Sequence, residues 1–326
     1  MIWLHVGLHK TGTTSIQGAL RLITHRARLA IWTIGDTPQA STRQWGEWAV
    51  RHAAHGDVIL SDETLLGDPT RGYPDLPIRL AHLREVLPMQ DVTVIVSLRR
   101  QDAWVQSVYL QSLQQGETWT PEEFWGQLRS SPFLRWTHLV SELESVLEPA
   151  GVRTLIHDSG RDAVADFLAL CGQKPPPTAG TTLRDNVSIS AAQAPVVRIL
   201  NESRNQEEVH HLRSFMQLSA GSPQRHRLSA FPEGVQEQIA AEYRSDWEAV
   251  TTRDPSVEWP AEPAPFAGHD LASPYVAEEA LRLLSIAIDQ AGIPRRPSVL
   301  ARAVTKIRTN PRDVPTAMVR AVRRRP

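Results

Sequence analysis

Short apolar segments alternate with amphipathic segments through the first half of the chain. Residues 1–6, 57–60, 92–98 and 152–156 are short, apolar runs typical of buried strands. Residues 92–98 are apolar and β-branched without a break, which is expected of a parallel strand covered on both faces. Because strands and helices alternate, the pattern predicts an α/β three-layer fold with a mainly parallel central sheet and helices on both faces.

The segments between and after these strands carry apolar residues at helical spacing. In the first half the helices are expected at 13–27, 76–86, 102–113, 133–147 and 163–170, with a further helix starting at Pro121. The proline-rich connector 173–180 is the strongest internal boundary. Beyond it the pattern is helical, at 190–200, 235–249 and 277–291. We expect residues 1–294 to form one domain with a helical C-terminal part.

Charge separates the last residues from the rest. The formal net charge of the whole chain is -1, yet 295–326 contain ten basic residues and one acid, Asp313, so the remainder is strongly acidic. That balance gives no overall attraction to nucleic acid. The segment 295–326 is expected to be either a solvated tail or a basic amphipathic helix that contacts an anionic membrane surface or a polyanion.

Cysteine content and hydropathy bear on the compartment. The single cysteine, Cys171, excludes an internal disulfide framework and a cysteine-based zinc cluster. No apolar stretch approaches the roughly 20 residues of a membrane helix, and the first apolar run is too short for a signal peptide. The sequence therefore predicts a cytoplasmic protein.

The segment 5–15, HVGLHKTGTTS, links the first expected strand to the first expected helix. Gly7 and Gly12 have the spacing of a Walker A loop, GxxxxGK[ST], but the lysine is Lys10, two residues before the second glycine. Backbone N–H groups at such a strand-to-helix turn bind anions, and the hydroxyls of Thr13, Thr14 and Ser15 add donors. The loop suits a phosphate-like group, but Lys10 is not expected to reach the β- and γ-phosphates as a Walker lysine does.

The residues that follow the strand expected at 92–98 argue against a Mg-ATP enzyme. Such an enzyme needs an acid at a strand end to hold the metal, and 92–98 is followed by Arg99 and Arg100. A small-molecule kinase would have to bind its metal through Asp62. Such a kinase is one alternative function. A non-catalytic nucleotide-binding or interaction protein is the other.

Lys10, Thr11, Gly12, Thr13, Thr14 and Ser15 resemble the 5′-phosphosulfate loop of the sulfotransferases that use 3′-phosphoadenosine 5′-phosphosulfate (PAPS). That loop reads K-[ST]-G-[ST]-[ST] after a strand. In the same family an arginine at the end of a central strand and a serine eight residues later bind the 3′-phosphate, and Arg99 and Ser107 have this spacing. The resemblance covers about residues 1–205, is greatest to bacterial enzymes with carbohydrate-like acceptors, and implies a P-loop-like fold.

The chain departs from the family at three places. Ser15 stands where cytosolic aryl and steroid enzymes have a tryptophan, and Leu155-Ile-His-Asp replaces a common Tyr-Glu-Asp stretch. The basic loop that grips the 3′-phosphate is not recognisable, so Arg184, within 182–188, is expected to take its role.

The resemblance implies sulfuryl transfer from PAPS to a hydroxyl of a sugar, glycolipid or other small metabolite, with 3′-phosphoadenosine 5′-phosphate (PAP) as product and no metal. Lys10 is expected to neutralise the leaving oxygen. Glu63 is the first choice for the general base, with Asp62, His9, His52 and His55 as alternatives. Asp62 and Glu63 also suit a helix start. Four aromatic residues could stack a base or a sugar, or belong to the core: Trp104, Tyr109, Trp119 and Trp125.

Overall fold

The computed structural model describes residues 1–23, 29–33, 42–157, 162–174, 189–202, 228–252 and 266–267, and the helical residues Val276, Glu279 and Arg282. The chain divides into two compact units. The first comprises Met1–Trp104, Gln127–Asn186 and Ala240–Trp259, and the second Val105–Gly126, Val187–Ile239 and Pro260–Pro326. The expected division at residues 294 and 295 falls outside the described residues and stays a prediction.

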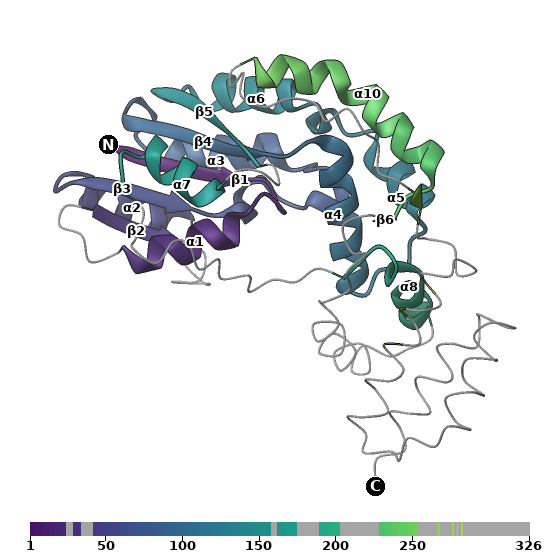
Figure 1. Ribbon diagram of the computed structural model, residues 1–326. Coiled ribbons are helices and arrows are strands. Elements are labelled where there is room, and N and C mark those ends of the chain that lie inside the picture. The colour runs from purple at the N-terminus through teal and green to yellow at the C-terminus, as the bar shows by residue number, and fades with distance from the viewer. Residues whose placement is uncertain are drawn as a thin grey trace, which may run out of the picture. The chain divides into compact units, whose positions relative to one another are not determined.

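A five-stranded sheet organises the first unit (Figure 1). Its strands are β1 (Ile2–Gly7), β2 (Leu29–Thr33), β3 (Asp57–Ser61), β4 (Val92–Leu98) and β5 (Gly151–Ile156). All neighbours pair in parallel, in the order β2-β3-β1-β4-β5. The predicted α/β fold with a parallel sheet is confirmed, and β2 is a strand that the sequence pattern did not predict.

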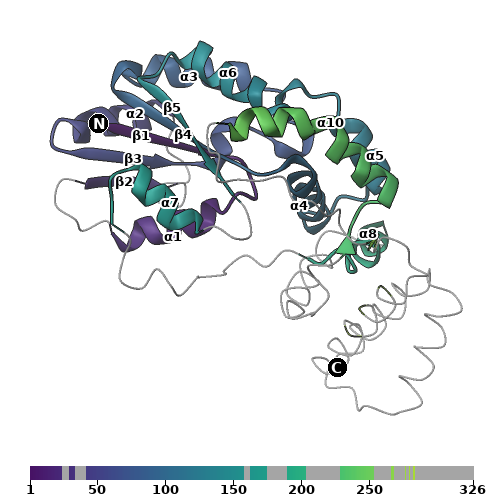
Figure 2. The same cartoon turned by 45° about the horizontal axis from the view of Figure 1, so that its top comes forward.

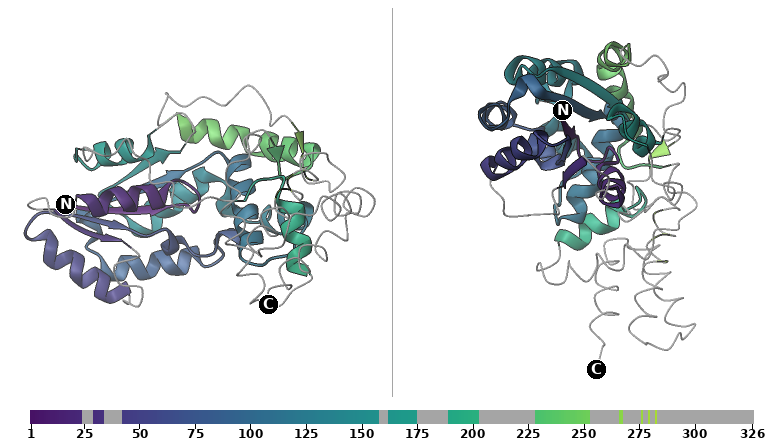
Figure 3. Two further views of the ribbon diagram at one scale, coloured as in Figure 1. Left: turned by 60° about the horizontal axis from the view of Figure 1, so that its bottom comes forward. Right: turned by 90° about the vertical axis from the view of Figure 1, so that its left-hand side faces the viewer.

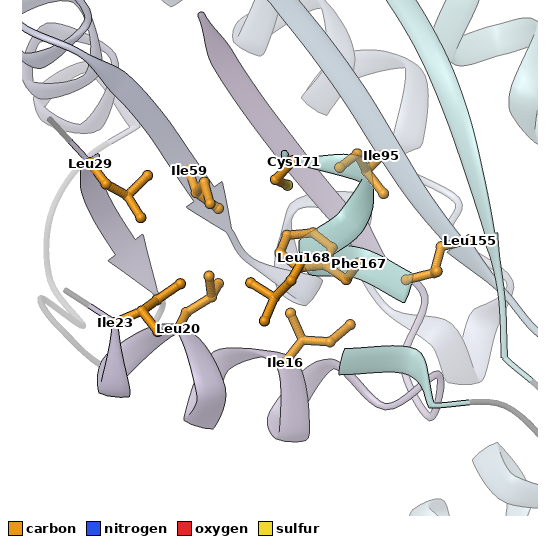
Figure 4. Packing of buried hydrophobic residues seen from close by; sticks show 10 residues of the cluster. All are labelled: Ile16, Leu20, Ile23, Leu29, Ile59, Ile95, Leu155, Phe167, Leu168 and Cys171. Carbon is orange, nitrogen blue, oxygen red and sulfur yellow. The ribbon is translucent and has the colours of Figure 1, made fainter. Parts of the chain in front are cut away.

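Helices cover the two faces of this sheet, as the views in Figures 2 and 3 show. On one face lie α1 (Thr13–Leu22) and α7 (Ala163–Leu170), and on the other α2 (Thr42–Ala53), α3 (Leu76–Val86) and α6 (Trp136–Leu147). Figure 4 shows the core beneath α1, where Ile16 and Leu20 meet Ile59 and Ile95 of the sheet and Phe167 of α7. This packing fixes α1 against the strands β3 and β4.

The remaining elements are helical apart from one short strand pair. They are α4 (Gln101–Gln114), α5 (Pro121–Leu128), α8 (Ala194–Glu202), α10 (Glu233–Thr251) and the paired strands β6 (Leu228–Ser229) and β7 (Phe266–Ala267). In place of the single helix expected at 133–147, a 3-10 turn, Pro132–Leu134, precedes α6. Most of the helix expected at 277–291, the connector at 175–180 and the tail at 295–326 lie outside the described residues.

The second unit has its own packing centre around Tyr109 of α4. The Tyr109 ring lies 5.4 Å from that of Phe124 and 5.3 Å from that of Phe231, measured between centroids. Asn201 of α8 donates hydrogen bonds from Nδ2 to the carbonyl oxygens of Leu113 and Glu117. These contacts join α4, α8 and the segment before α10 within this unit.

Candidate active site

Four strands bring the candidate groups to one edge of the sheet. Because β1, β3, β4 and β5 are parallel, their carboxyl ends meet there. The glycine loop follows β1, Asp62 and Glu63 follow β3, Arg99 follows β4 and His157 follows β5. The expectation that the acidic pair comes from a strand beside the first is confirmed by the pairing of β1 with β3.

The loop backbone turns sharply at two residues. Lys10 has a φ of 67° and Gly12 a φ of 81°, both in the left-handed region. A lysine in that region costs about 1–2 kcal/mol relative to right-handed backbone, and such strain is typical of sites where geometry matters. Gly12 is the N-cap of α1 and has no side chain with which to cap it, and the first intrahelical bond joins Ile16 N–H to the Gly12 carbonyl.

Close packing explains both glycines. A Cβ atom on Gly7 would lie 2.6 Å from Thr13 Oγ1, so only glycine lets α1 start this close to β1. A Cβ on Gly12 would lie 3.1 Å from Nδ1 of His157. His157 therefore packs against the loop from the end of β5, a contact that the spacing of residues along the chain does not reveal.

Side-chain donors hold three successive carbonyl groups of the loop. Thr11 Oγ1 donates to the Leu8 carbonyl oxygen over 2.5 Å. Trp104 Nε1 donates to the His9 carbonyl over 2.9 Å, and Arg99 Nη1 to the Lys10 carbonyl over 3.3 Å. Carbonyl oxygens repel an anion, so their engagement by these donors leaves the N–H side of the loop and the positive end of α1 for a negative ligand.

Lys10 of the loop and Glu63 after β3 influence each other electrostatically. Burial lowers the pKa of the Lys10 ammonium, the Glu63 carboxylate opposes this shift, and the Arg99 guanidinium adds to it. Burial raises the pKa of Glu63, and the Asp62 carboxylate raises it further, while Thr13 and Lys10 lower it. A carboxylate with a raised pKa is a better proton acceptor than an ordinary glutamate.

Asp62 has a structural task that Glu63 does not share. Its Oδ1 accepts hydrogen bonds from the Thr64 N–H and the Thr64 hydroxyl, both over 2.7 Å, and so caps the 3-10 helix η1 (Glu63–Leu66). Burial raises the pKa of Asp62, and the two bonds from Thr64 lower it. The expected role of a helix-start acid is therefore confirmed for Asp62.

A family model described as a sulfotransferase domain matches residues 4–162. These residues form a sulfotransferase domain. The match includes the loop, the acidic pair, Arg99 and His157, and it confirms the resemblance to sulfotransferases. No curated protein and no solved structure matches the chain.

The histidines of the sulfotransferase domain occupy different places. Burial and the charge of Lys10 lower the pKa of His9 to about 4, and Asp68 opposes them, so the ring is neutral near pH 7. His52 and His55 precede β3, whose first residue, Asp57, pairs with the chain's amino group over 3.5 Å. They lie at the amino edge of the sheet, opposite the loop.

A buried hydrogen-bonded triad underlies the loop. His5 of β1 is bonded through Nδ1 to the Ser61 hydroxyl over 2.8 Å and through Nε2 to the Ser97 hydroxyl over 2.7 Å. Burial lowers the pKa of His5 to about 3, so the ring stays neutral, with one nitrogen donating and the other accepting. The triad ties β3, β1 and β4 together directly below the residues that follow them.

The remaining predicted residues separate into three groups. Arg100 pairs with Asp102 through two hydrogen bonds of 2.5 and 2.8 Å. Ser107 lies on α4 in the second unit, and its expected role beside Arg99 stays a prediction. Arg184 lies outside the described residues.

The aromatic candidates prove to be mostly core. Trp104, Tyr109 and Trp125 are buried, and Trp119 is half-buried. Sequence reasoning also missed Tyr73, a fully buried residue with a left-handed φ of 61° whose ring lies 6.3 Å from that of His9. Its signal is weak, since Gly72 and Pro74 beside it mark a turn and nothing more. Among the described residues, no helix is long and apolar enough to span a membrane.

Proposed function

We propose that this sulfotransferase domain moves a sulfuryl group from PAPS to an acceptor hydroxyl of a sugar, glycolipid or other small metabolite. The observation that carries the proposal is the set of three loop carbonyls, of Leu8, His9 and Lys10, held by side-chain donors. Their engagement favours an anion at the N-terminus of α1. Arg99 contributes one of these bonds and adds a second positive charge to the same edge of the sheet.

The residues present fit PAP and PAPS. The N–H groups and hydroxyls of the segment from Thr11 to Ser15 suit the 5′-phosphate. A bidentate arginine suits the 3′-phosphate, and we assign this role to Arg99, with Ser107 and Arg184 as further ligands. We propose that the transfer needs no metal ion.

PAPS supplies the sulfuryl group in activated form, and the chain supplies charge and a base. Glu63 takes the proton from the acceptor hydroxyl, supported by its raised pKa and its electrostatic coupling to Lys10. Lys10 stabilises the negative charge that develops on the leaving phosphate oxygen, with the hydroxyls of Thr13 and Thr14 beside it. The low pKa of His9 makes it a weak base, so we assign it to contact with the acceptor.

A kinase is a poorer fit to the same residues. Asp62, its candidate metal ligand, already accepts two hydrogen bonds from Thr64. Arg99 at the adjacent strand end would repel a cation.

We further propose a cytoplasmic location and contact of the basic segment 295–326 with an anionic membrane, both of which rest on the sequence alone.

Transfer of ³⁵S from labelled PAPS to a panel of sugar, glycolipid and phenolic acceptors tests the function. We expect labelled product with the wild-type protein and none with Lys10→Ala. Transfer of ³²P from γ-labelled ATP to the same panel, without any transfer of ³⁵S, would contradict the proposal and favour the kinase.

A further inference from the structure

The successive carbonyl groups at the end of β4 accept hydrogen bonds from different kinds of donor. The Ser97 carbonyl accepts from the Leu8 N–H and the Leu98 carbonyl from the His157 N–H, so both are bonded to adjacent strand ends. The Arg100 carbonyl accepts from the Trp104 N–H, the first bond of α4. Between them, the Arg99 carbonyl accepts from a side chain, the indole Nε1 of Trp136, over 2.7 Å.

The anion-binding loop depends on a second indole. Of its three engaged carbonyls, those of Leu8 and Lys10 are held by Thr11 and Arg99, which are themselves candidate ligands. The His9 carbonyl is held from outside the site, by Trp104 Nε1 over 2.9 Å. This bond fixes the peptide just before Lys10, where the backbone enters the left-handed region.

The two tryptophans form one rigid pair. Both side chains are fully buried, and their rings meet edge to face with centroids 5.3 Å apart and an interplanar angle of 89°. The backbone N–H of Trp136 donates to Oδ2 of the buried Asp246 on α10 over 2.7 Å. One indole N–H of the pair thus points at the loop and the other at the strand end, and the pair is anchored from outside the matched residues 4–162.

We propose that Trp104 and Trp136 are positioning residues, which set the loop that carries Lys10 and the strand end that carries Arg99 through their indole N–H groups. The inference rests on the proposed function, because it assigns the two indoles to two parts of one ligand. Trp136 acts through Arg99, and hence on the 3′-phosphate. Trp104 acts through the loop, and hence on the 5′-phosphate.

Phenylalanine variants separate these roles, because phenylalanine keeps an aromatic ring and removes the N–H donor. Calorimetric affinities for PAP and for adenosine 5′-monophosphate (AMP), which lacks the 3′-phosphate, are measured for wild type, Trp136→Phe, Trp104→Phe and Trp3→Phe. Trp3 is the matched control, since its Nε1 has no hydrogen-bond partner within the described residues. Where Trp136→Phe fails to fold, 3-benzothienylalanine at position 136 keeps the shape of the indole and replaces its N–H with sulfur.

Loss of one hydrogen bond to a buried carbonyl should change affinity by roughly tenfold. For Trp136→Phe we expect the preference for PAP over AMP to fall by about that factor, and AMP affinity to fall less than PAP affinity, because Arg99 also holds the Lys10 carbonyl. For Trp104→Phe both affinities should fall together and the preference should stay. Trp3→Phe should alter neither.

The outcomes separate this inference from the function. If the wild-type protein binds no PAP, the proposed function and this inference both fall. If the wild type prefers PAP and Trp136→Phe keeps the full preference, this inference alone is wrong. A loss of preference in Trp3→Phe as large as that in Trp136→Phe would also overturn it, because general loosening of the core would then explain both.

Discussion

Arg99 extends from the end of β4 to the loop after β1, where its Nη1 donates a 3.3 Å hydrogen bond to the Lys10 carbonyl oxygen. The two basic residues of the site are therefore joined through a backbone atom. Burial lowers the pKa of Lys10, and the positive charge of Arg99 lowers it further. Such an arrangement of positive groups has no purpose in packing and is suited to a ligand with more than one negative group.

Lys10 should be essential for transfer, and its left-handed backbone conformation should lower the stability of the folded protein. Lys10→Ala and Lys10→Gly should each lower kcat at least about 10²-fold, because the leaving oxygen loses its positive partner. Lys10→Gly should be the more stable of the two by about 1 kcal/mol, because glycine adopts a φ of 67° without strain. Urea unfolding and ³⁵S transfer measure the two effects. Equal stability of the two variants would contradict the role of backbone strain.

Glu63 and Asp62 should differ in their effect on catalysis. Glu63→Gln should lower kcat about 10²-fold to 10⁴-fold without unfolding the protein, because it removes the proposed base. Asp62→Asn keeps an acceptor for the Thr64 N–H and should leave kcat within about threefold. The wild-type kcat should rise with pH through the raised pKa of Glu63, above the ordinary value of 4.5. A Glu63→Gln variant with the wild-type pH profile would exclude Glu63 as the base.

Stability should fall as the buried His5 is forced to accept a proton. Its pKa is about 3 in the folded protein and 6.5 in the unfolded chain, so the unfolded chain binds more protons between these values. The stabilisation is complete above pH 6.5 and is lost as pH falls from there towards 3. Relative to His5→Gln, the wild-type free energy of unfolding should lose up to about 1.4 kcal/mol per pH unit in this window. Parallel curves for the two proteins would refute the assignment.

Asp246 should stabilise the matched domain from outside it. The carboxylate accepts hydrogen bonds from the N–H groups of Trp136 and Thr137 and from Gln101, and so caps α6 and holds the start of α4. Asp246→Ala should lower the free energy of unfolding by about 2–4 kcal/mol, because several buried donors lose their acceptor. Glu248→Ala, an exposed site on the same helix, should change it by less than about 0.5 kcal/mol. Similar effects of the two substitutions would contradict this role.

Local signals in the sequence predicted much of the site. The spacing of Gly7, Lys10 and Gly12 identified the loop, and the apolar run before Arg99 placed that residue at a strand end. The missing pieces depend on contacts between distant residues. Trp104 lies 95 residues from the carbonyl that it holds, Trp136 lies 37 residues from Arg99, and Asp246 lies 110 residues from Trp136. No periodicity or short motif records such pairs.

Some elements of the fold were likewise predicted from the sequence and others were missed. Runs such as 92–98 are apolar throughout and identify a covered strand without further information. The edge strand β2, Leu29–Thr33, was missed, because an apolar run of five residues cannot be told from a helix segment by periodicity alone. Helix boundaries near prolines were also shifted, as at Pro132, where a 3-10 turn replaces the first turn of the expected helix.

Thermal unfolding with PAP and with ATP and Mg²⁺ tests the central claim most directly, since it needs no knowledge of the acceptor. A ligand that binds only the folded protein raises Tm, and at a fixed ligand concentration the rise increases with the logarithm of its affinity. We predict a clear rise in Tm with PAP, a much smaller one with ATP and Mg²⁺, and a reduced response to PAP in Arg99→Ala. Stabilisation by ATP and Mg²⁺ that equals or exceeds that by PAP would contradict the account.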